Sequence, residues 1–214
     1  MMVDYFIEAI NLIALDHIAV AGNSLDQASD HIASSLGVNL QKGGYHERFG
    51  THNRLLGLTD GLYLEAIAIK SETKKPRYPR WFNLDNFEGN ARIINWICRS
   101  TNINSDLMNL FYEGTEIVRM KRDQLEWLMA LPRDGILPFE GAAPALLQWK
   151  TTPPTGKLVP SGCSLKHLTI FHPEAKKIEN KMQILNDPRV SYEVHKRLHF
   201  FAEFATPNGI RVLE

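Results

Sequence analysis

The chain has 214 residues, 44% of them hydrophobic, so it can bury a full core as one large domain or two small ones. Lys and Arg together number 24, as do Asp and Glu, so no net charge recruits nucleic acid or an acidic membrane, and we expect a small-molecule partner. Cys98 and Cys163 lie far apart and fit neither a disulfide framework nor a Cys-x-x-Cys metal site, which indicates the reducing cytoplasm. Acidic residues interrupt the apolar residues 1–21 and no basic segment leads them, so we predict no signal peptide and no membrane span.

The first predicted strand, residues 15–21, alternates with period two, and His17 shares one side with Leu15, Ala19 and Ala21. A helix follows and ends before Gly37. A single histidine in a strand is usually an ordinary hydrogen-bonded residue, so His17 becomes a candidate only with a partner on a neighbouring strand.

The segment 50–69 predicts a hairpin, because two apolar runs flank Asp60-Gly61, a pair favoured in two-residue turns. If Thr59 pairs with Leu62, three polar side chains share one face of the hairpin: His52, Arg54 and Glu65. Asn53 then points away from them, and a β-bulge would alter this register. Because Glu65 lies inside an apolar strand, its carboxylate either reaches solvent across an open sheet or has a partner inside a concave one.

The order strand, helix, hairpin recurs twice more along the chain. The second copy comprises strands and a helix at residues 90–98, 103–113, 124–130 and 145–149. The third copy begins with SLKHLTIF, which aligns with LDHIAV without a gap. Its elements are a strand, a helix and three strands at residues 164–171, 173–185, 189–194, 198–205 and 210–213.

These repeats predict an α+β protein whose βαβββ units form curved mixed β-sheets with helices on the convex sides. The units span residues 14–70, 90–150 (a degenerate copy) and 163–214, and together form one compact protein. Segments rich in charge, Pro and Gly separate them at residues 70–89 and 150–162. The first segment carries a basic aromatic run that we interpret as a solvated linker: Lys74, Lys75, Arg77, Tyr78, Arg80 and Trp81.

The strings LDHIAVA, GTHNRLLGL and LYLEAIAI, with the intervening helix and the DG turn, resemble the vicinal-oxygen-chelate superfamily of glyoxalases, bleomycin resistance proteins and dioxygenases. GTHNR with YLE is most similar to its glyoxalase-like domain family. The resemblance implies that two units build a cup-shaped sheet, and that the first and last strands of each unit hold a divalent metal inside it. It places ligands at His17, Glu65 and His167, with Glu65 also the catalytic carboxylate.

The implied ligand set is incomplete. Trp96 and Gln148 stand where the second copy should have its histidine and glutamate, and Glu214 is one residue out of register in the third. His52, His167 or Gln148 could complete a site for zinc, iron, manganese, nickel or cobalt. The alternative is a cup that has kept its shape and lost its metal, since incomplete ligand sets bind weakly.

Two classes of function remain open at this stage. If the metal is present, the resemblance implies a lyase, isomerase or dioxygenase acting on a small oxygenated compound. The residues expected to contact that substrate are His52, Asn53, Arg54 and Gln148. Otherwise the protein is a non-enzymatic binder of a small ligand, with Trp96, Trp127 and Trp149 as walls, or a dimerisation module. Units could pair within one chain or between two, so a homodimer also remains open.

Overall fold

The computed structural model describes residues 13–214. We predicted neither a signal peptide nor a membrane span in residues 1–21. Residues 1–12 of that segment lie outside the described residues. Within residues 13–214, every helix is too short or too polar to cross a bilayer.

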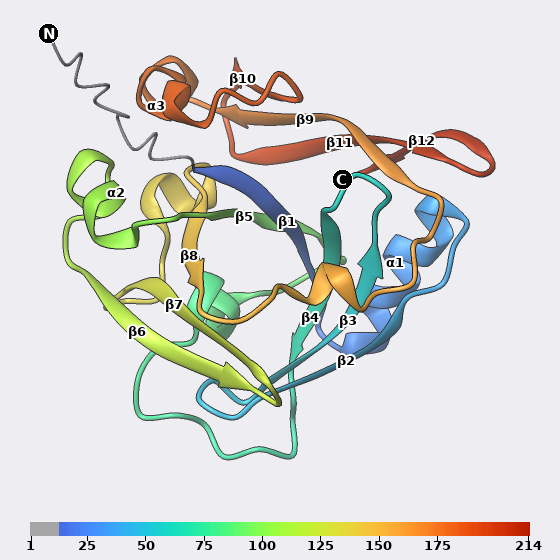
Figure 1. The fold of residues 1–214 in the computed structure, drawn as a ribbon, viewed down its shortest axis with the longest axis horizontal. Helices are drawn as coiled ribbons and strands as arrows, with labels where there is room; N and C mark the ends of the chain where they lie inside the picture. The colour runs from blue at the N-terminus through green and yellow to red at the C-terminus, as the bar shows by residue number, and fades with distance from the viewer. Residues whose placement is uncertain (1–12) are drawn as a thin grey trace, which may run out of the picture.

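Two sheets make up the described chain (Figure 1). The larger has eight strands in the order β2-β3-β4-β1-β5-β8-β7-β6: β1 (Ala14–Ala21), β2 (Gln41–His46), β3 (Thr51–Gly57), β4 (Tyr63–Ile69), β5 (Arg92–Arg99), β6 (Thr115–Arg122), β7 (Leu125–Pro132) and β8 (Ala145–Trp149). The smaller has four strands in the order β10-β9-β11-β12: β9 (Ser164–His172), β10 (Val190–Val194), β11 (His199–Thr206) and β12 (Gly209–Leu213).

The larger sheet consists of two halves with matching topology. In each half the first strand pairs in parallel with the last, β1 with β4 and β5 with β8, and the antiparallel pair β1–β5 joins the halves. The sheet curls so far that its two outermost strands come into contact. Arg122 on β6 donates a hydrogen bond to His46 on β2. The predicted α+β architecture of curved mixed sheets is confirmed.

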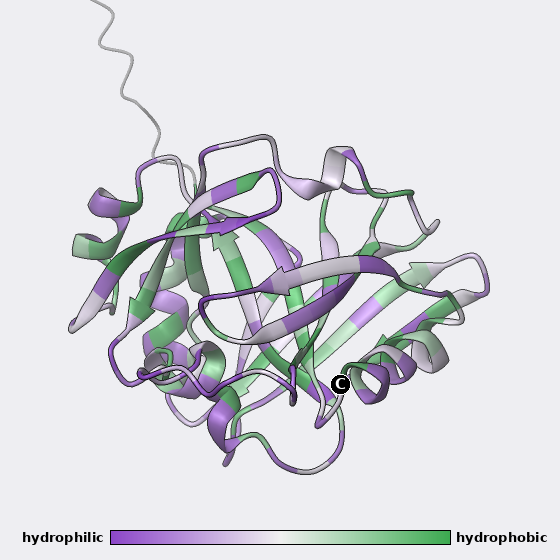
Figure 2. Ribbon diagram, turned by 90° about the horizontal axis from the view of Figure 1, so that it is seen from below, coloured by the Kyte–Doolittle hydropathy of each residue, from purple (hydrophilic) through white to green (hydrophobic). Residues whose placement is uncertain are grey.

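Three α-helices lie among the described residues, α1 (Leu25–Leu36), α2 (Ile103–Asn109) and α3 (Ala175–Met182), with short 3₁₀ turns at η1 (Trp81–Asn86), η2 (Pro138–Gly141), η3 (Pro154–Gly156) and η4 (Gln183–Leu185). The side chain of Ser24 caps the start of α1 by accepting a hydrogen bond from the Gln27 N–H, and Gly37 ends the helix in the left-handed conformation. Figure 2 shows hydrophobic and hydrophilic residues alternating along α1. Its apolar residues, such as Ile32 and Leu36, pack on the convex face of the sheet, which leaves the concave face free for a site.

The third segment has the predicted element order, but its strands are arranged differently. Its first strand, β9, lies between β10 and β11, whereas β1 pairs with the last strand of its unit. The smaller sheet therefore does not reproduce the half-cup of the larger one. The unit boundaries at residues 14–70, 90–150 and 163–214 stay a prediction.

The register of the β3–β4 hairpin corrects our prediction by one residue. Leu58 N donates to Leu62 O, and Leu55 is opposite Glu65, so the connection is a three-residue loop in which Gly61 has φ +78°. A one-residue shift moves every side chain of a strand to the opposite face. Asn53 therefore shares the face of Glu65, while two side chains predicted to do so lie on the convex side: His52 and Arg54.

Two further differences concern the second half. Helix α2 ends at Asn109 rather than at residue 113, because Leu110 is already extended. Strand β6 was not predicted at all, since its sequence TEIVRMKR is rich in charge, as is common for edge strands. This missed strand ends at Arg122, which reaches the concave face.

Candidate active site

The structure brings His17 and Glu65 together on the concave face. They lie on the neighbouring strands β1 and β4, and His17 Nε2 is 3.6 Å from Glu65 Oε2. Both residues are buried, with exposed fractions of 5% and 6%. The imidazole also stacks on the ring of Tyr63, with 4.3 Å between ring centroids and 15° between planes. This contact fixes the orientation of the imidazole ring.

A β-bulge adds a second carboxylate to this pair. The register between β1 and β5 shifts between Leu15 and His17, so Leu15 turns into the core behind the sheet. Asp16, although adjacent in sequence, then reaches His17: its Oδ1 lies 2.7 Å from Nδ1, while its Oδ2 accepts from Trp149 Nε1 at 2.9 Å. The imidazole is therefore held between Asp16 on Nδ1 and Glu65 on Nε2.

The three groups stabilise one another's charged forms. Burial alone would raise the pKa of Glu65, but the hydrogen bond and charge of His17 outweigh it and lower the pKa to about 2. Burial likewise opposes the shift in Asp16, whose pKa is lowered by the same imidazole. The pKa of His17 is raised, because the two carboxylates outweigh the loss of solvation. Each group therefore favours the charged form of its neighbours, so the arrangement favours an imidazolium between two carboxylates.

Asn53 completes the surroundings of Glu65. Its Nδ2 donates to Glu65 Oε1 at 2.5 Å, and its Oδ1 accepts from the Gly44 N–H at 2.8 Å. Strand β2 can approach this closely only because residue 43 is glycine: a Cβ on Gly43 would lie 2.1 Å from Asn53 Oδ1. Asn53 is thus fixed from both sides and presents its amide to the carboxylate.

A second histidine lies across the cup and is neutral. Burial lowers the pKa of His46 to about 4, with the nearby charges of Arg122 and His17 acting in the same direction. Arg122 Nη1 donates to His46 Nε2 at 3.2 Å, so the ring proton sits on Nδ1 and is donated to Thr51 Oγ1 at 3.1 Å. The edge of the ring meets Trp81, whose centroid is 4.9 Å away.

The space between these groups is small. The cavity measures about 30 Å³ and is bounded by His17, Glu65, His46 and Arg122, together with Trp127 and Trp149. That volume corresponds to about one water molecule. Trp81 and Phe82 also bound the cavity, and Phe82 adopts φ +57°, a conformation that few bulky residues tolerate. Trp81 and Phe82 therefore limit the size of ligand that the cavity admits.

The covering segment corrects our interpretation of residues 70–89 as a solvated linker. Arg80 is 4% exposed: its Nη1 pairs with Asp85 at 2.6 Å, and its Nε donates to the Phe49 carbonyl at 2.7 Å. Trp81 is equally buried and stacks on Phe49 with 4.5 Å between centroids. Lys74 and its neighbour Lys75 are exposed, so only the first part of the basic run is solvated.

Four sequence-predicted residues are not brought to the cavity. His167 is exposed on β9 in the smaller sheet, and Gln148 binds the Thr101 carbonyl on the convex side of β8. Arg54 forms an ion pair with Asp26 of α1, and His52 shares its face. The last two were misplaced by the hairpin register, and His167 by the different strand order around β9.

The second half of the cup contributes mainly apolar and aromatic side chains. Trp127 and Trp149 line the cavity as predicted walls, but Trp96 points into the core behind the sheet and donates to the Ala142 carbonyl. On the concave face, the residues where a second pair of ligands would lie are Ile97 and Leu147. Neither can bind a metal.

The side chains present do not fit a resident divalent metal. Across residues 13–214, no three His, Cys, Asp or Glu side chains gather as an ion would require. Glu65 Oε1 is already taken by Asn53, and both nitrogens of His46 are bonded. The guanidinium of Arg122 also places a positive charge beside the cavity, which would repel a cation. The predicted trio of His17, Glu65 and His167 is not assembled.

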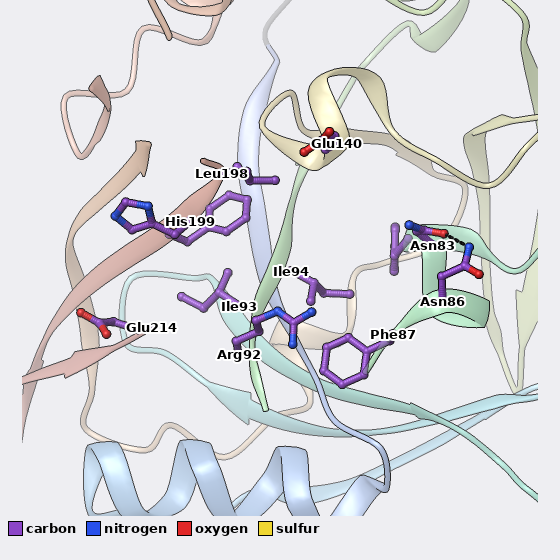
Figure 3. Close-up of a pocket in the computed structure, with 12 residues that line it drawn as sticks. Asn83, Asn86, Phe87, Arg92, Ile93, Ile94, Glu140, Leu198, His199 and Glu214 are labelled. Atoms are coloured by element: carbon purple, nitrogen blue, oxygen red, sulfur yellow. Dashed lines mark hydrogen bonds between the residues drawn. The ribbon is translucent and has the colours of Figure 1, made fainter. Parts of the chain in front are cut away.

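A larger open hollow of about 400 Å³ lies where β5 meets β11 (Figure 3). Its polar side chains bond to their own neighbours: Asn86 donates to Asn83, and Arg92 donates to the carbonyls of Glu88 and Asn90. It shares Phe82 with the smaller cavity. The titratable side chains that line it, Arg92, Glu140, His199 and Glu214, form no ion pair with one another among residues 13–214, so we take the smaller cavity as the candidate active site.

Comparison with known proteins identifies a matching family and solved structures of similar fold. A family profile described as a glyoxalase-like domain matches residues 15–185. A hypothetical protein from Staphylococcus aureus is 16% identical over 95% of this chain and 99% of its own, with a TM-score of 0.62. Methylmalonyl-CoA epimerase from Mycobacterium tuberculosis is 16% identical over 73% of this chain and 97% of its own, with a TM-score of 0.45. No curated protein sequence matches the chain.

Proposed function

The chain belongs to the glyoxalase-like domain family, and we propose that its small cavity binds a small oxygenated molecule on which His17 and Glu65 carry out proton transfer. The reaction class is that of an isomerase or lyase that converts a carbonyl compound into its enol. Each proton transfer is assigned to a side chain of this chain.

The observation that carries the proposal is a buried imidazole held between two carboxylates, an arrangement that favours all three charged forms. Removing each of these ions from water costs several kcal/mol, and a fold of this size gains nothing by placing them in an apolar cup. Asp16, His17 and Glu65 nevertheless are at most 6% exposed, beside a cavity rather than in solid core. Strongly shifted ionisable groups beside a cavity are characteristic of catalytic sites.

The coupling between His17 and Glu65 defines the proton movements. His17 donates its Nε2 proton to the carbonyl oxygen of the substrate, where negative charge develops. The pKa of Glu65 is low mainly because the charge of His17 outweighs burial, so the loss of that charge restores its basicity. In the same step Glu65 accepts the proton from the carbon next to the carbonyl. One proton moves from carbon to Glu65 and one from His17 to oxygen, and reversal on either face gives isomerisation.

The test is hydrogen exchange in D₂O. The protein is incubated with small aldehydes, ketones and 2-oxo acids, and deuterium at the carbon next to the carbonyl is measured by proton NMR. We expect exchange above the buffer rate, abolished in Glu65→Gln and His17→Gln. The matched control is His52→Gln, on the neighbouring strand but the opposite face, which retains exchange. Saturable binding without exchange in the wild type would overturn the enzymatic proposal.

One observation favours a second function, a binding protein without catalysis. Three tryptophans bound the cavity, Trp81, Trp127 and Trp149, and an aromatic enclosure binds apolar rings well. In that case aromatic compounds quench tryptophan fluorescence saturably, and the affinity survives Glu65→Gln. Under the enzymatic proposal, the same substitution weakens binding of the oxygenated ligands.

A further inference from the structure

The side chain of Arg122 is charged but has no acidic partner among residues 13–214. Its side chain crosses from the end of β6 toward β2, and its one hydrogen bond among the described residues is the donation to His46 Nε2 at 3.2 Å. It forms no ion pair with any acidic side chain of residues 13–214, although it bounds a cavity containing Glu65. A guanidinium has five N–H donors, so most of its hydrogen-bonding capacity remains open.

His46 holds the guanidinium in place without neutralising it. The imidazole is uncharged and is oriented by Thr51, so it offers one lone pair to one N–H of Arg122. A carboxylate in the same position would hold the arginine equally well but would cancel its charge. The arrangement therefore positions a full positive charge at the cavity.

Strand β2 is shaped to admit this side chain. The pairing of β2 with β3 is irregular between Lys42 and Tyr45, where two glycines interrupt the strand. A Cβ on Gly44 would lie 2.7 Å from Arg122 Cδ and 3.1 Å from its Nε. Gly43 and Gly44 thus make room for two residues of the cavity, Asn53 and Arg122.

Outside the cavity, Arg122 also lines an open groove of about 420 Å³. The groove carries Lys42 and Lys157 beside Arg122, against a single acidic residue, Asp123. An excess of positive charge around an opening concentrates anions there. The same guanidinium is therefore accessible from a basic groove on one side and adjoins the His17–Glu65 pair on the other.

We propose that Arg122 binds the carboxylate of the substrate, so the substrates of this cavity are small 2-oxo acids. This inference rests on the proposed proton transfer. The planar fork of arginine matches a carboxylate through two parallel hydrogen bonds. In a 2-oxo acid the carbonyl adjoins the carboxylate, so gripping one end directs the reactive end toward His17 and Glu65. The small volume of the cavity favours acids of few carbon atoms.

The test compares a charged probe with a neutral one of the same size. Pyruvate carries a carboxylate where butane-2,3-dione carries an acetyl group, and both compounds have methyl protons that exchange through an enol. Saturable binding of each is measured by calorimetry and deuterium uptake by NMR. We expect the wild type to bind pyruvate at least about tenfold more tightly, a difference that disappears in Arg122→Gln.

Two further variants sharpen the result. Lys121→Gln removes the neighbouring charge of the same strand, which is exposed and faces Glu126, and should leave the preference for pyruvate unchanged. Gly44→Ala keeps the arginine but displaces it, and should weaken pyruvate binding while butane-2,3-dione is bound as before. Melting curves identify any variant that fails to fold, and Arg122→Lys, which keeps the charge without the fork, should then give an intermediate affinity.

The outcomes separate this inference from the proposed function. Glu65-dependent exchange on both probes, with no preference for pyruvate, would leave the proton transfer standing and overturn the role of Arg122. Pyruvate binding that depends on Arg122 but is accompanied by no exchange would support the carboxylate site and refute the chemistry. No saturable binding of pyruvate, glyoxylate or 2-oxobutanoate would overturn the inference.

Discussion

Replacing Asn53 by alanine tests the observed hairpin register against the one predicted from the turn. The substitution removes two hydrogen bonds, one to the buried carboxylate of Glu65 and one from the Gly44 N–H. A bond to a charged acceptor contributes about 1.5–3 kcal/mol and a neutral one about 0.5–1.5 kcal/mol. We therefore expect Asn53→Ala to lower the free energy of unfolding by about 2–4 kcal/mol. That is a large part of the typical stability of about 5–15 kcal/mol.

The matched control is the adjacent residue. The His52 side chain is half-buried on the convex side and has no hydrogen-bond partner among the described residues, so His52→Ala should change the free energy of unfolding by less than about 0.5 kcal/mol. Urea denaturation followed by circular dichroism measures both. At a slope of about 3 kcal/mol per molar, Asn53→Ala shifts the midpoint by roughly 1 M. Equal effects of the two substitutions, or a larger effect at His52, would refute the observed register.

Three further predictions follow from the cavity and its cover. The free energy of unfolding should fall as the pH drops from 6.5 toward 4 and again from 4.5 toward 2, because the folded protein binds protons more weakly than the unfolded chain at His46 (pKa about 4) and at Glu65 (pKa about 2). The pKa of His17 is raised, so the stability that this residue contributes is lost as the pH rises above 6.5. Urea midpoints measured across this pH range follow all three groups. Protein purified without chelator should carry less than one equivalent of any divalent metal by elemental analysis, and chelator-resistant, stoichiometric metal that disappears in Glu65→Gln would contradict this. Arg80→Ala should lower the free energy of unfolding by about 1–3 kcal/mol and Arg77→Ala by less than about 0.5 kcal/mol, because only Arg80 is buried. Equal effects of the two substitutions would support the interpretation of this segment as a solvated linker.

The pairing of His17 with Glu65 could be predicted from sequence because it depends on robust signals. Alternation with period two marks β1, and a glutamate in an otherwise apolar strand requires a partner. The two strands belong to one βαβββ unit, in which the first and last strands are neighbours. Helix α1 was equally predictable, since a capping serine and a terminal glycine delimit it.

The rest of the site depends on features that a single sequence does not specify. Asp60-Gly61 is compatible with a two-residue and a three-residue loop, yet this choice decides whether His52 or Asn53 faces Glu65. The bulge at Asp16 cannot be recognised in the alternation pattern of the sequence. A bulge is an extra residue relative to the partner strand, so it can be identified only when the pairing of the two strands is known. The one available signal for Arg122 was indirect: adjacent glycines in a strand, Gly43-Gly44, indicate close approach by another chain segment.

In the proposed proton transfer, the charges of the cavity can balance without a metal. With Asp16 and Glu65 ionised and His17 protonated, their charges and that of Arg122 sum to zero before a ligand enters. Moving one proton alone would leave an uncompensated charge in an apolar enclosure, which costs several kcal/mol. When His17 gives a proton to the substrate oxygen and Glu65 takes one from carbon, both lose their charges together and the total is unchanged. The protein thus supplies within one cavity the charge compensation that a metal ion would otherwise provide.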